Sequence, residues 1–229
     1  MADTADVWWA GRQDAASGRL TALLDEAEHG RWTTYRREED RQRFLVGCSL
    51  AKTVVASATG QNPADVVFDR TCPDCGKPHG KPRITGGDLE LSVSHSGDRI
   101  AVALMTGRPV GVDVEQVRQT HDRDSLERYV MSDAERSGSP GDLFTVWTRK
   151  EAVTKATGDG LRVSFKEVVL AAEPLRVVSW PYETPPSAAT LFDLDAGPGY
   201  VAALAVIGGC DGVVSHDGTA LLAEEIGRL

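Results

Sequence analysis

The chain has 229 residues, and its 34 acidic and 25 basic side chains give a formal net charge of −9. This balance disfavours general binding to nucleic acid or an anionic membrane, because both need a positive field at the protein surface. Hydrophobic residues make up 41% of the chain, which is typical of a globular protein with a buried core. The sequence has neither an apolar run near the ~20 residues that span a bilayer nor a signal peptide at its start. We therefore expect a cytoplasmic protein without a nucleic-acid or membrane partner.

The first half of the chain predicts one long helix followed by strands. Apolar residues at three- and four-residue spacing predict a helix over 36–58, ended by Gly60. Residues 66–68 form a short candidate strand, whereas glycine and proline are too dense over 71–87 for regular structure. Alternating polarity then predicts a hairpin and a further strand, at 89–95, 99–105 and 110–114.

The second half repeats this order of elements. A short helix is expected between 125 and 136, and a longer one starts with Ser139 as N-cap and ends at Gly158. Strands are then expected at 165–170, 175–180, 190–194 and 200–207, and a short helix is expected at 219–226. Residues 201–205 also resemble 100–104. We therefore expect an α+β fold of two similar halves, 1–106 and 107–229, each a small, mainly antiparallel sheet packed on a long helix.

Two motifs place carboxylates where they can act together. Asp113 and Glu115 share one face of the predicted strand 110–114, about 6–7 Å apart at the backbone. Trp147, Glu151 and Lys155 share one face of the later helix. Taken separately, these motifs are also consistent with a solvated edge strand and a surface Glu–Lys pair. Together they would suit Mg²⁺, which prefers oxygen ligands and often bridges substrate phosphates.

Other polar residues are candidates for contacting phosphate. Ser94 and His95 end a predicted strand at a turn, where hydroxyl, imidazole and backbone N–H groups can meet a phosphate. A histidine in this position is also commonly structural. Five arginines gather beside the first helix, an arrangement also typical of a solvated face: Arg31, Arg36, Arg37, Arg41 and Arg43.

The cysteines do not form a disulfide framework. Cys48 and Cys210 lie in separate apolar stretches and are typical of buried thiols. Cys72 and Cys75 form a C-x-x-C motif, with His79 as a third possible zinc ligand. A closed structural zinc site needs four ligands, and the sequence offers no clear fourth. A zinc-binding adaptor is therefore one hypothesis among others.

The order and spacing of several motifs resemble the 4′-phosphopantetheinyl transferases of the surfactin-synthetase-activating type. The resemblance covers roughly residues 31–161, and the pairing of G-V-D-V-E with W-T-R-K-E-A-V-T-K is its strongest part. The full set is the arginine-bearing helix with R-F-L-V-G, then G-K-P, S-H-S-G, G-V-D-V-E, W-T-R-K-E-A-V-T-K and G-D-G-L.

This resemblance implies a monomer of two similar α+β halves with an active site between them. Members of the family move the phosphopantetheine arm of coenzyme A to a serine of an acyl or peptidyl carrier domain and release 3′,5′-ADP. The resemblance also suggests that the chain modifies carriers of polyketide or non-ribosomal peptide synthesis. An alternative is a non-catalytic regulatory module that binds coenzyme A or a carrier.

The resemblance also implies roles for particular residues. Asp113, Glu115 and Glu151 would hold Mg²⁺, Glu151 would take the proton of the carrier serine, and Lys155 would stabilise charge on the departing phosphate. Several residues match coenzyme A contacts of the family. Arg31 and Arg43 match the basic lining near the 3′-phosphate, Lys81 and Pro82 match residues lining the adenosine pocket, and Ser94 and His95 match phosphate-contacting positions. Asp113 and Lys155 are also matched to coenzyme A contacts. Because carrier domains are acidic, Arg162 and Lys166 are candidate carrier contacts.

Two positions depart from the family pattern. Family members often have a basic residue near the position of Glu28 and a hydroxyl residue at that of Phe44. An acid beside the 3′-phosphate of coenzyme A would weaken binding, so we expect either a shifted alignment or replacement by Arg36 or Arg37.

Overall fold

The computed structural model describes residues 3–118, 122–138, 141–182 and 188–229. The helices are α1 (Glu26–Thr34), α2 (Glu38–Thr59), α3 (Arg123–Val130), α4 (Asp133–Gly138), α5 (Leu143–Thr157) and α6 (Gly218–Arg228). The strands are β1 (Thr4–Gly11), β2 (Phe68–Thr71), β3 (Pro78–Ile84), β4 (Leu89–Ser96), β5 (Arg99–Thr106), β6 (Val110–Gln116), β7 (Val169–Ala172), β8 (Leu175–Ser179), β9 (Thr190–Leu194), β10 (Tyr200–Val206) and β11 (Gly212–Asp217). Short 3₁₀ turns cover Arg12–Ser17, Arg19–Leu23, Pro63–Asp65 and Gly160–Arg162.

The predicted α+β fold with two similar halves is confirmed. The first half contains a sheet of order β11-β1-β5-β4, and the second contains one of order β6-β10-β9. Apart from the parallel β1–β11 pair, neighbouring strands in both sheets are antiparallel. The order β1, α2, hairpin β2–β3, β4 and β5 is repeated as β6, α5, hairpin β7–β8, β9 and β10. The similar segments 100–104 and 201–205 occupy the equivalent strands β5 and β10.

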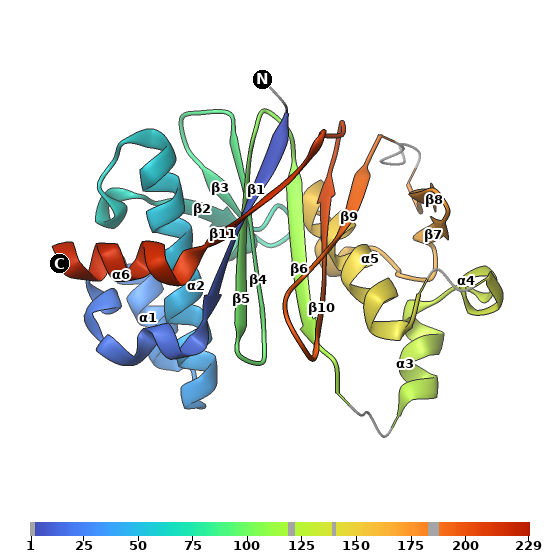
Figure 1. Cartoon of the computed structure of the whole chain (residues 1–229), viewed down its shortest axis with the longest axis horizontal. Coiled ribbons are helices and arrows are strands. Elements are labelled where there is room, and N and C mark those ends of the chain that lie inside the picture. The colour runs from blue at the N-terminus through green and yellow to red at the C-terminus, as the bar shows by residue number, and fades with distance from the viewer. Residues whose placement is uncertain (1–2, 119–121, 139–140, 183–187) are drawn as a thin grey trace.

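Each sheet packs on the long helix of its own half. Figure 1 shows the two sheets side by side, with α1, α2 and α6 outside the first and α3, α4 and α5 outside the second. The core of the first half includes Val54 and Val55 of α2 with Ile100 and Val102 of β5. The last elements, β11 and α6, pack on β1 and α2 and thus join the first half. The boundary at residues 106 and 107 stays a prediction.

Serine side chains connect the two sheets where β4 lies beside β6. The hydroxyl oxygens of Ser92, Ser94 and Ser96 accept hydrogen bonds from the backbone N–H groups of Val112, Val114 and Gln116, at 3.0, 3.3 and 3.1 Å. These bonds satisfy polar groups that an edge strand would otherwise leave unpaired. The alternating serines of β4 therefore hold the two halves together.

Helix α5 approaches β6 unusually closely. The side chain of Asp142 caps its first turn by accepting from the N–H of Thr145 at 3.0 Å, and Gly158 ends it in the left-handed conformation, at a φ of 80°. A Cβ at Gly111 would lie only 2.0 Å from the carbonyl oxygen of Ala152. Only glycine therefore allows α5 to sit this close to β6, which places Glu151 and Lys155 beside the acidic strand.

Several predicted boundaries were wrong. The helix predicted to start at Ser139 has its N-cap at Asp142, because the Asp142 carboxylate reaches the free N–H of the first turn; Ser139 itself lies outside the described residues. The segment 71–87 contains strand β3, and the predicted strand 165–170 begins only at Val169. The single helix expected over 125–136 is α3 followed by α4. Elements β1, α1 and β11 were not predicted.

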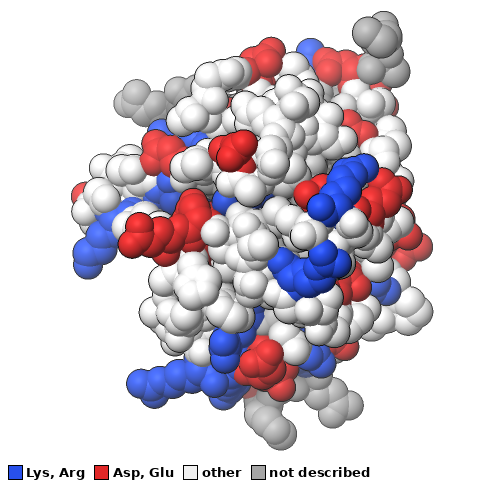
Figure 2. All heavy atoms as spheres, turned by 90° about the vertical axis from the view of Figure 1, so that its left-hand side faces the viewer, with Lys and Arg blue, Asp and Glu red and all other residues white. Residues whose placement is uncertain are grey.

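Charge is mixed over the outside of the first half. Figure 2 shows acidic and basic side chains interspersed on the face that α1, α2 and α6 cover, without a large area of one sign.

Within the described residues, no helix is long and apolar enough to cross a membrane.

Candidate functional site

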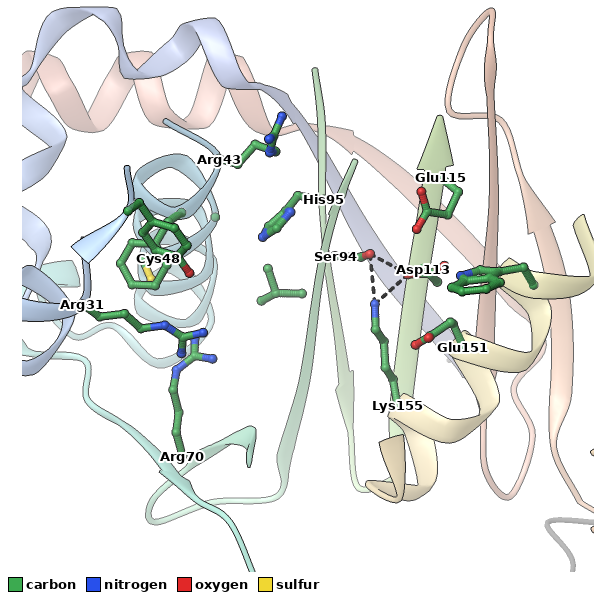
Figure 3. A pocket seen from close by; sticks show the side chains of 15 residues that line it. Arg31, Arg43, Cys48, Arg70, Ser94, His95, Asp113, Glu115, Glu151 and Lys155 are labelled. Atoms are coloured by element: carbon green, nitrogen blue, oxygen red, sulfur yellow. Dashed lines mark hydrogen bonds and ion pairs between the residues drawn. The ribbon is translucent and has the colours of Figure 1, made fainter. Parts of the chain in front are cut away.

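A pocket of about 310 Å³ lies between the two halves, and most of the predicted site residues line it. Elements α1, α2 and β2 supply one wall, and β4, β6 and α5 supply the other (Figure 3). The lining residues are Arg31, Tyr35, Arg43, Phe44, Gly47, Cys48, Arg70, Val93, Ser94, His95, Asp113, Glu115, Trp147, Glu151 and Lys155.

The wall formed by β4, β6 and α5 carries the carboxylates of Asp113, Glu115 and Glu151, and we call it the acidic wall. Lys155 and Asp113 lie at its centre. The Lys155 ammonium lies 2.7 Å from Asp113 Oδ1, 3.0 Å from Ser94 Oγ and 3.3 Å from the Val112 carbonyl oxygen. Ser94 also donates to Asp113 Oδ1 at 2.7 Å (Figure 3). The other oxygen, Asp113 Oδ2, is buried and has no hydrogen-bond partner within the described part of the chain. Such an atom is costly to bury unless a ligand compensates it.

Glu115 and Glu151 extend into the same pocket (Figure 3). Burial raises the pKa of Glu151 to about 7, with Asp113 and Glu115 acting in the same direction and Lys155 opposing them. Burial also raises the pKa of Glu115, whose carboxylate accepts a 2.7 Å hydrogen bond from Ser96. Burial therefore makes the charged forms of both carboxylates costly unless a further positive charge lies beside them.

The three carboxylates face one pocket without forming a closed ligand cluster. Among the described residues, Cys72, Cys75 and His79 alone bring three ligand atoms within 4.8 Å of one another. One oxygen of Asp113 is already bound to Lys155 and Ser94. Carboxylates without a cation between them repel one another, so their separation has a physical reason.

A basic wall faces the carboxylates. Arg31 of α1 and Arg70 of β2 extend toward one another, and Arg43 lies higher on the same side (Figure 3). Arg43 donates to the Gly97 carbonyl oxygen at 2.8 Å and pairs with Asp40. The His95 side chain also lines the pocket, between the two walls. Desolvation and the positive charge of Lys155 lower the pKa of its imidazole. Arg70 was not predicted, because the hairpin β2–β3 places it here through tertiary contacts.

The two departures from the family pattern have different surroundings in the structure. Glu28 is buried, caps the start of α1 by accepting from the N–H of Asp25, and lies 2.8 Å from Lys52. Its charge is therefore compensated outside the pocket. Phe44 lines the pocket, with the Arg31 guanidinium 5.4 Å from its ring centre. Arg70, rather than Arg36 or Arg37, supplies the second basic side chain beside Arg31.

Four predicted residues do not line this pocket. Lys81 and Pro82 lie on β3, and Lys81 pairs with Glu90 at 3.0 Å. Lys81 and Arg162 line a second pocket of about 460 Å³. Lys166 is exposed after α5. The adenosine role of Lys81 and Pro82 and the carrier role of Arg162 and Lys166 stay predictions.

Lys150, within the same helical motif, faces away from the pocket. Its side chain is fully buried and donates to Glu135 Oε2 and to the carbonyl oxygens of Val130 and Phe165, at 2.7, 2.7 and 2.8 Å. Glu135 in turn accepts from the N–H of Leu170 at 2.9 Å. This network anchors the outer face of α5, so Lys150 has a structural role.

Both halves of the chain match known families. Residues 109–205 match a model described as the 4′-phosphopantetheinyl transferase superfamily, and residues 8–106 match one described as 4′-phosphopantetheinyl transferase, N-terminal. The chain is 32% identical over 197 residues to 4′-phosphopantetheinyl transferase HetI of Nostoc sp., covering 82% of this chain and 81% of the relative. It is 32% identical over 167 residues to a phosphopantetheinyl transferase of Thraustochytrium sp., covering 65% and 57%.

A more distant relative is 4′-phosphopantetheinyl transferase ffp of Bacillus subtilis, 25% identical over 151 residues and covering 62% of this chain and 64% of the relative. One family model ends with strand β5, and the other begins directly before strand β6. The chain therefore belongs to the 4′-phosphopantetheinyl transferase superfamily and is an enzyme of that family.

Proposed function

We propose that the chain transfers the 4′-phosphopantetheine arm of coenzyme A to a serine of an acyl or peptidyl carrier domain, with Mg²⁺ required. The observation that carries this proposal is one pocket with arginines on one wall and three carboxylates with a lysine on the other. Coenzyme A is highly anionic, so its binding to an acidic protein requires a local basic surface. Arg31, Arg43 and Arg70 provide that surface, and a cation on the acidic wall would complete it.

The acidic wall has the properties expected of a Mg²⁺ site. Mg²⁺ takes carboxylate oxygens, keeps several waters and commonly bridges substrate phosphates. Asp113 offers a buried oxygen without a partner in the described residues, and burial raises the pKa of both Glu115 and Glu151. Asp113, Glu115 and Glu151 would hold the ion. When bound, Mg²⁺ would neutralise charge on the pyrophosphate and on the departing 3′,5′-ADP.

The reaction forms a bond between the serine oxygen and the β-phosphorus while the bond from that phosphorus to the bridging oxygen breaks. The serine proton leaves with the base, and the bridging oxygen leaves on 3′,5′-ADP. Glu151, which faces the same pocket as Asp113 and Lys155, would take the proton as the general base. Lys155 would exchange its contact with Ser94 or Val112 for a pyrophosphate oxygen and stabilise the developing charge.

The carrier is expected to approach the end of α5. Arg162 and Lys166 are exposed after that helix, and positive side chains complement an acidic carrier. We propose a monomer that acts in the cytoplasm, with polyketide or non-ribosomal peptide carriers as the substrates to test first. A side-by-side assay of apo carriers with coenzyme A and Mg²⁺ tests the function. Tight coenzyme A binding without transfer to any carrier would favour a regulatory module instead.

Glu151→Gln is expected to change how stability depends on pH in the metal-free protein. A carboxyl whose folded pKa is raised from 4.5 to about 7 contributes stability below pH 4.5 that is lost as the pH rises through about 7. The free energy of unfolding of the wild type should therefore fall relative to Glu151→Gln across this range. Urea unfolding in the presence of a chelator measures the difference, and Glu224→Gln is the exposed control.

Addition of Mg²⁺ near neutral pH should then stabilise the wild type more than Glu151→Gln, because binding to the folded state raises the free energy of unfolding. Equal pH profiles and equal responses to Mg²⁺ in both proteins would contradict the assigned metal site.

Arg31→Ala is expected to raise the KM for coenzyme A by about 10- to 100-fold, because a charge-assisted contact to phosphate is worth about 1.5–3 kcal/mol. The KM for dephospho-coenzyme A, which lacks the 3′-phosphate, should change little. Steady-state assays with the two donors measure this difference, and Arg176→Ala, exposed on β8, is the control. An equal increase for both donors would place Arg31 away from the 3′-phosphate.

A further inference from the structure

The loop of hairpin β2–β3 carries a cluster of potential metal ligands that the transfer reaction does not use. We define the Cys/His cluster as Cys72, Cys75 and His79, whose ligand atoms all lie within 4.8 Å of one another. Cys75 Sγ lies 2.9 Å from His79 Nε2, and both cysteines are free thiols. Ligands of a tetrahedral zinc ion lie roughly 3.5–3.8 Å apart, given bond lengths of about 2.0–2.3 Å. The observed spacing therefore needs only small side-chain adjustments to hold one ion.

The backbone of this loop already presents the two thiols together. The N–H of Gly76 donates to the carbonyl oxygen of Cys72 at 2.9 Å, and the N–H of Cys72 donates to that of Lys77 at 2.8 Å. Gly76 adopts a φ of 70°, which favours glycine directly after the second cysteine. The tight turn thus brings both halves of the C-x-x-C motif to the same place as His79, before any ion binds.

The loop end of the hairpin has little other support for its fold, although Phe68 of β2 and Ile84 of β3 pack in the core of the first half. Strands β2 and β3 form a separate two-stranded sheet, and the residues between them are mostly exposed. A two-stranded hairpin alone is marginally stable in water, and a metal is a common way to stabilise a small element of this kind. A zinc ion at the Cys/His cluster would stabilise the exposed loop end, away from the residues that pack in the core.

The hairpin also contacts the end of α5. Asp74, between the two cysteines, accepts from Arg162 at 3.1 Å, and Lys81 donates to the Ala156 carbonyl oxygen at 3.3 Å. The second pocket lies between these segments and is lined by Cys72 and His79 on one side and Asp159 and Arg162 on the other. The hairpin thus contacts the helix that carries Glu151 and Lys155.

We propose that Cys72, Cys75 and His79 bind one zinc ion, with a solvent molecule as fourth ligand, and that this ion holds the hairpin against the end of α5. Asp74 is next to the cluster, with Oδ2 4.0 Å from Cys72 Sγ, but its other oxygen is paired with Arg162. Thiolate and imidazole ligands favour zinc over Mg²⁺, so the two metal sites are chemically distinct.

Zinc content tests the site directly. The full chain, purified without chelator or a metal-affinity tag, is expected to contain about one zinc per molecule by mass spectrometry of the metal. Cys72→Ser and Cys75→Ser should lose the ion, whereas Cys210→Ser and His29→Gln, which change a cysteine and a histidine elsewhere, should retain it. A metal-free wild type, a native Cys72–Cys75 disulfide, or unchanged zinc in both serine variants would overturn the proposal.

Two measurements on the wild type keep the test independent of variant folding. Metal-free protein titrated with Co²⁺ should gain thiolate-to-cobalt charge-transfer absorption, and zinc should abolish it. Zinc should also slow amide hydrogen exchange over 72–79 and 156–162. Absence of the cobalt band would overturn the site, and unchanged exchange over 156–162 would overturn its proposed contact with α5. Neither readout depends on transferase activity, so both are separate from the proposed function.

Discussion

Asp113→Asn is expected to lower Mg²⁺-dependent transfer by at least about 100-fold, because it removes a carboxylate charge that would hold the Mg²⁺ needed to neutralise the pyrophosphate. Asparagine has the same shape and can keep the contacts to Ser94 and Lys155 through its carbonyl oxygen. The loss should therefore appear in transfer and in Mg²⁺ affinity rather than in folding. Initial rates across a Mg²⁺ titration, with excess apo carrier, measure the effect.

Asp65→Asn is the matched control, because Asp65 is exposed on a 3₁₀ turn outside the pocket. It should transfer at the wild-type rate. Near wild-type transfer by Asp113→Asn at low Mg²⁺ would remove Asp113 from the metal site. Thermal unfolding of all three proteins shows whether any loss of activity reflects loss of structure.

Lys150→Met is expected to lower the free energy of unfolding by about 3–5 kcal/mol, because it leaves the buried Glu135 carboxylate without its cation. The Lys150 side chain is 0% exposed and that of Glu135 is 1% exposed, so solvent cannot compensate the remaining charge. Urea unfolding followed by circular dichroism measures the change. The double variant with Glu135→Gln should recover part of the loss, since no buried charge then remains unpaired.

Lys166→Met provides the control, because Lys166 is exposed a short distance after α5. Its free energy of unfolding should change by less than about 1 kcal/mol. A similarly small change for Lys150→Met would show that the buried network does not anchor α5. The position of Lys150 directly before Glu151 in the helical motif would then need an explanation other than its ion pair with Glu135.

Periodicity predicted the central elements well because burial fixes them. Helix α2 and strands β4, β5 and β10 each bury a regular apolar face, and their repeated order correctly indicated two similar halves. The motifs around Asp113 and Glu151 also pointed to one site. The two motifs meet in the structure because Gly111 allows α5 to lie directly on β6.

Other elements depend on tertiary contacts that local patterns do not contain. Strand β11 forms because it pairs in parallel with β1, which lies about two hundred residues earlier in the chain. Strand β3 begins with Pro78 and contains Pro82, which local rules disfavour but an edge strand of a two-stranded hairpin tolerates. A capping box of Asp25 and Glu28 was an available signal for α1.

The same limit applies to the site. Arg70 comes from a hairpin whose position is set by packing, so its sequence context does not indicate the pocket. Ser94 was expected to contact phosphate, and in this structure it bonds Asp113 and Lys155, which places it at the same pocket. Glu28 was expected to weaken coenzyme A binding, because the sequence does not show that it pairs with the buried Lys52 of the next helix, α2.

Intact-protein mass spectrometry of the carrier shows whether this pocket performs phosphopantetheinyl transfer. Purified chain, coenzyme A, Mg²⁺ and a panel of apo acyl and peptidyl carrier domains would be incubated with and without chelator. At least one carrier is expected to gain the mass of one phosphopantetheine arm on its serine, only with Mg²⁺ and with release of 3′,5′-ADP. Coenzyme A binding without a mass gain on any carrier would show that this pocket does not carry out the transfer.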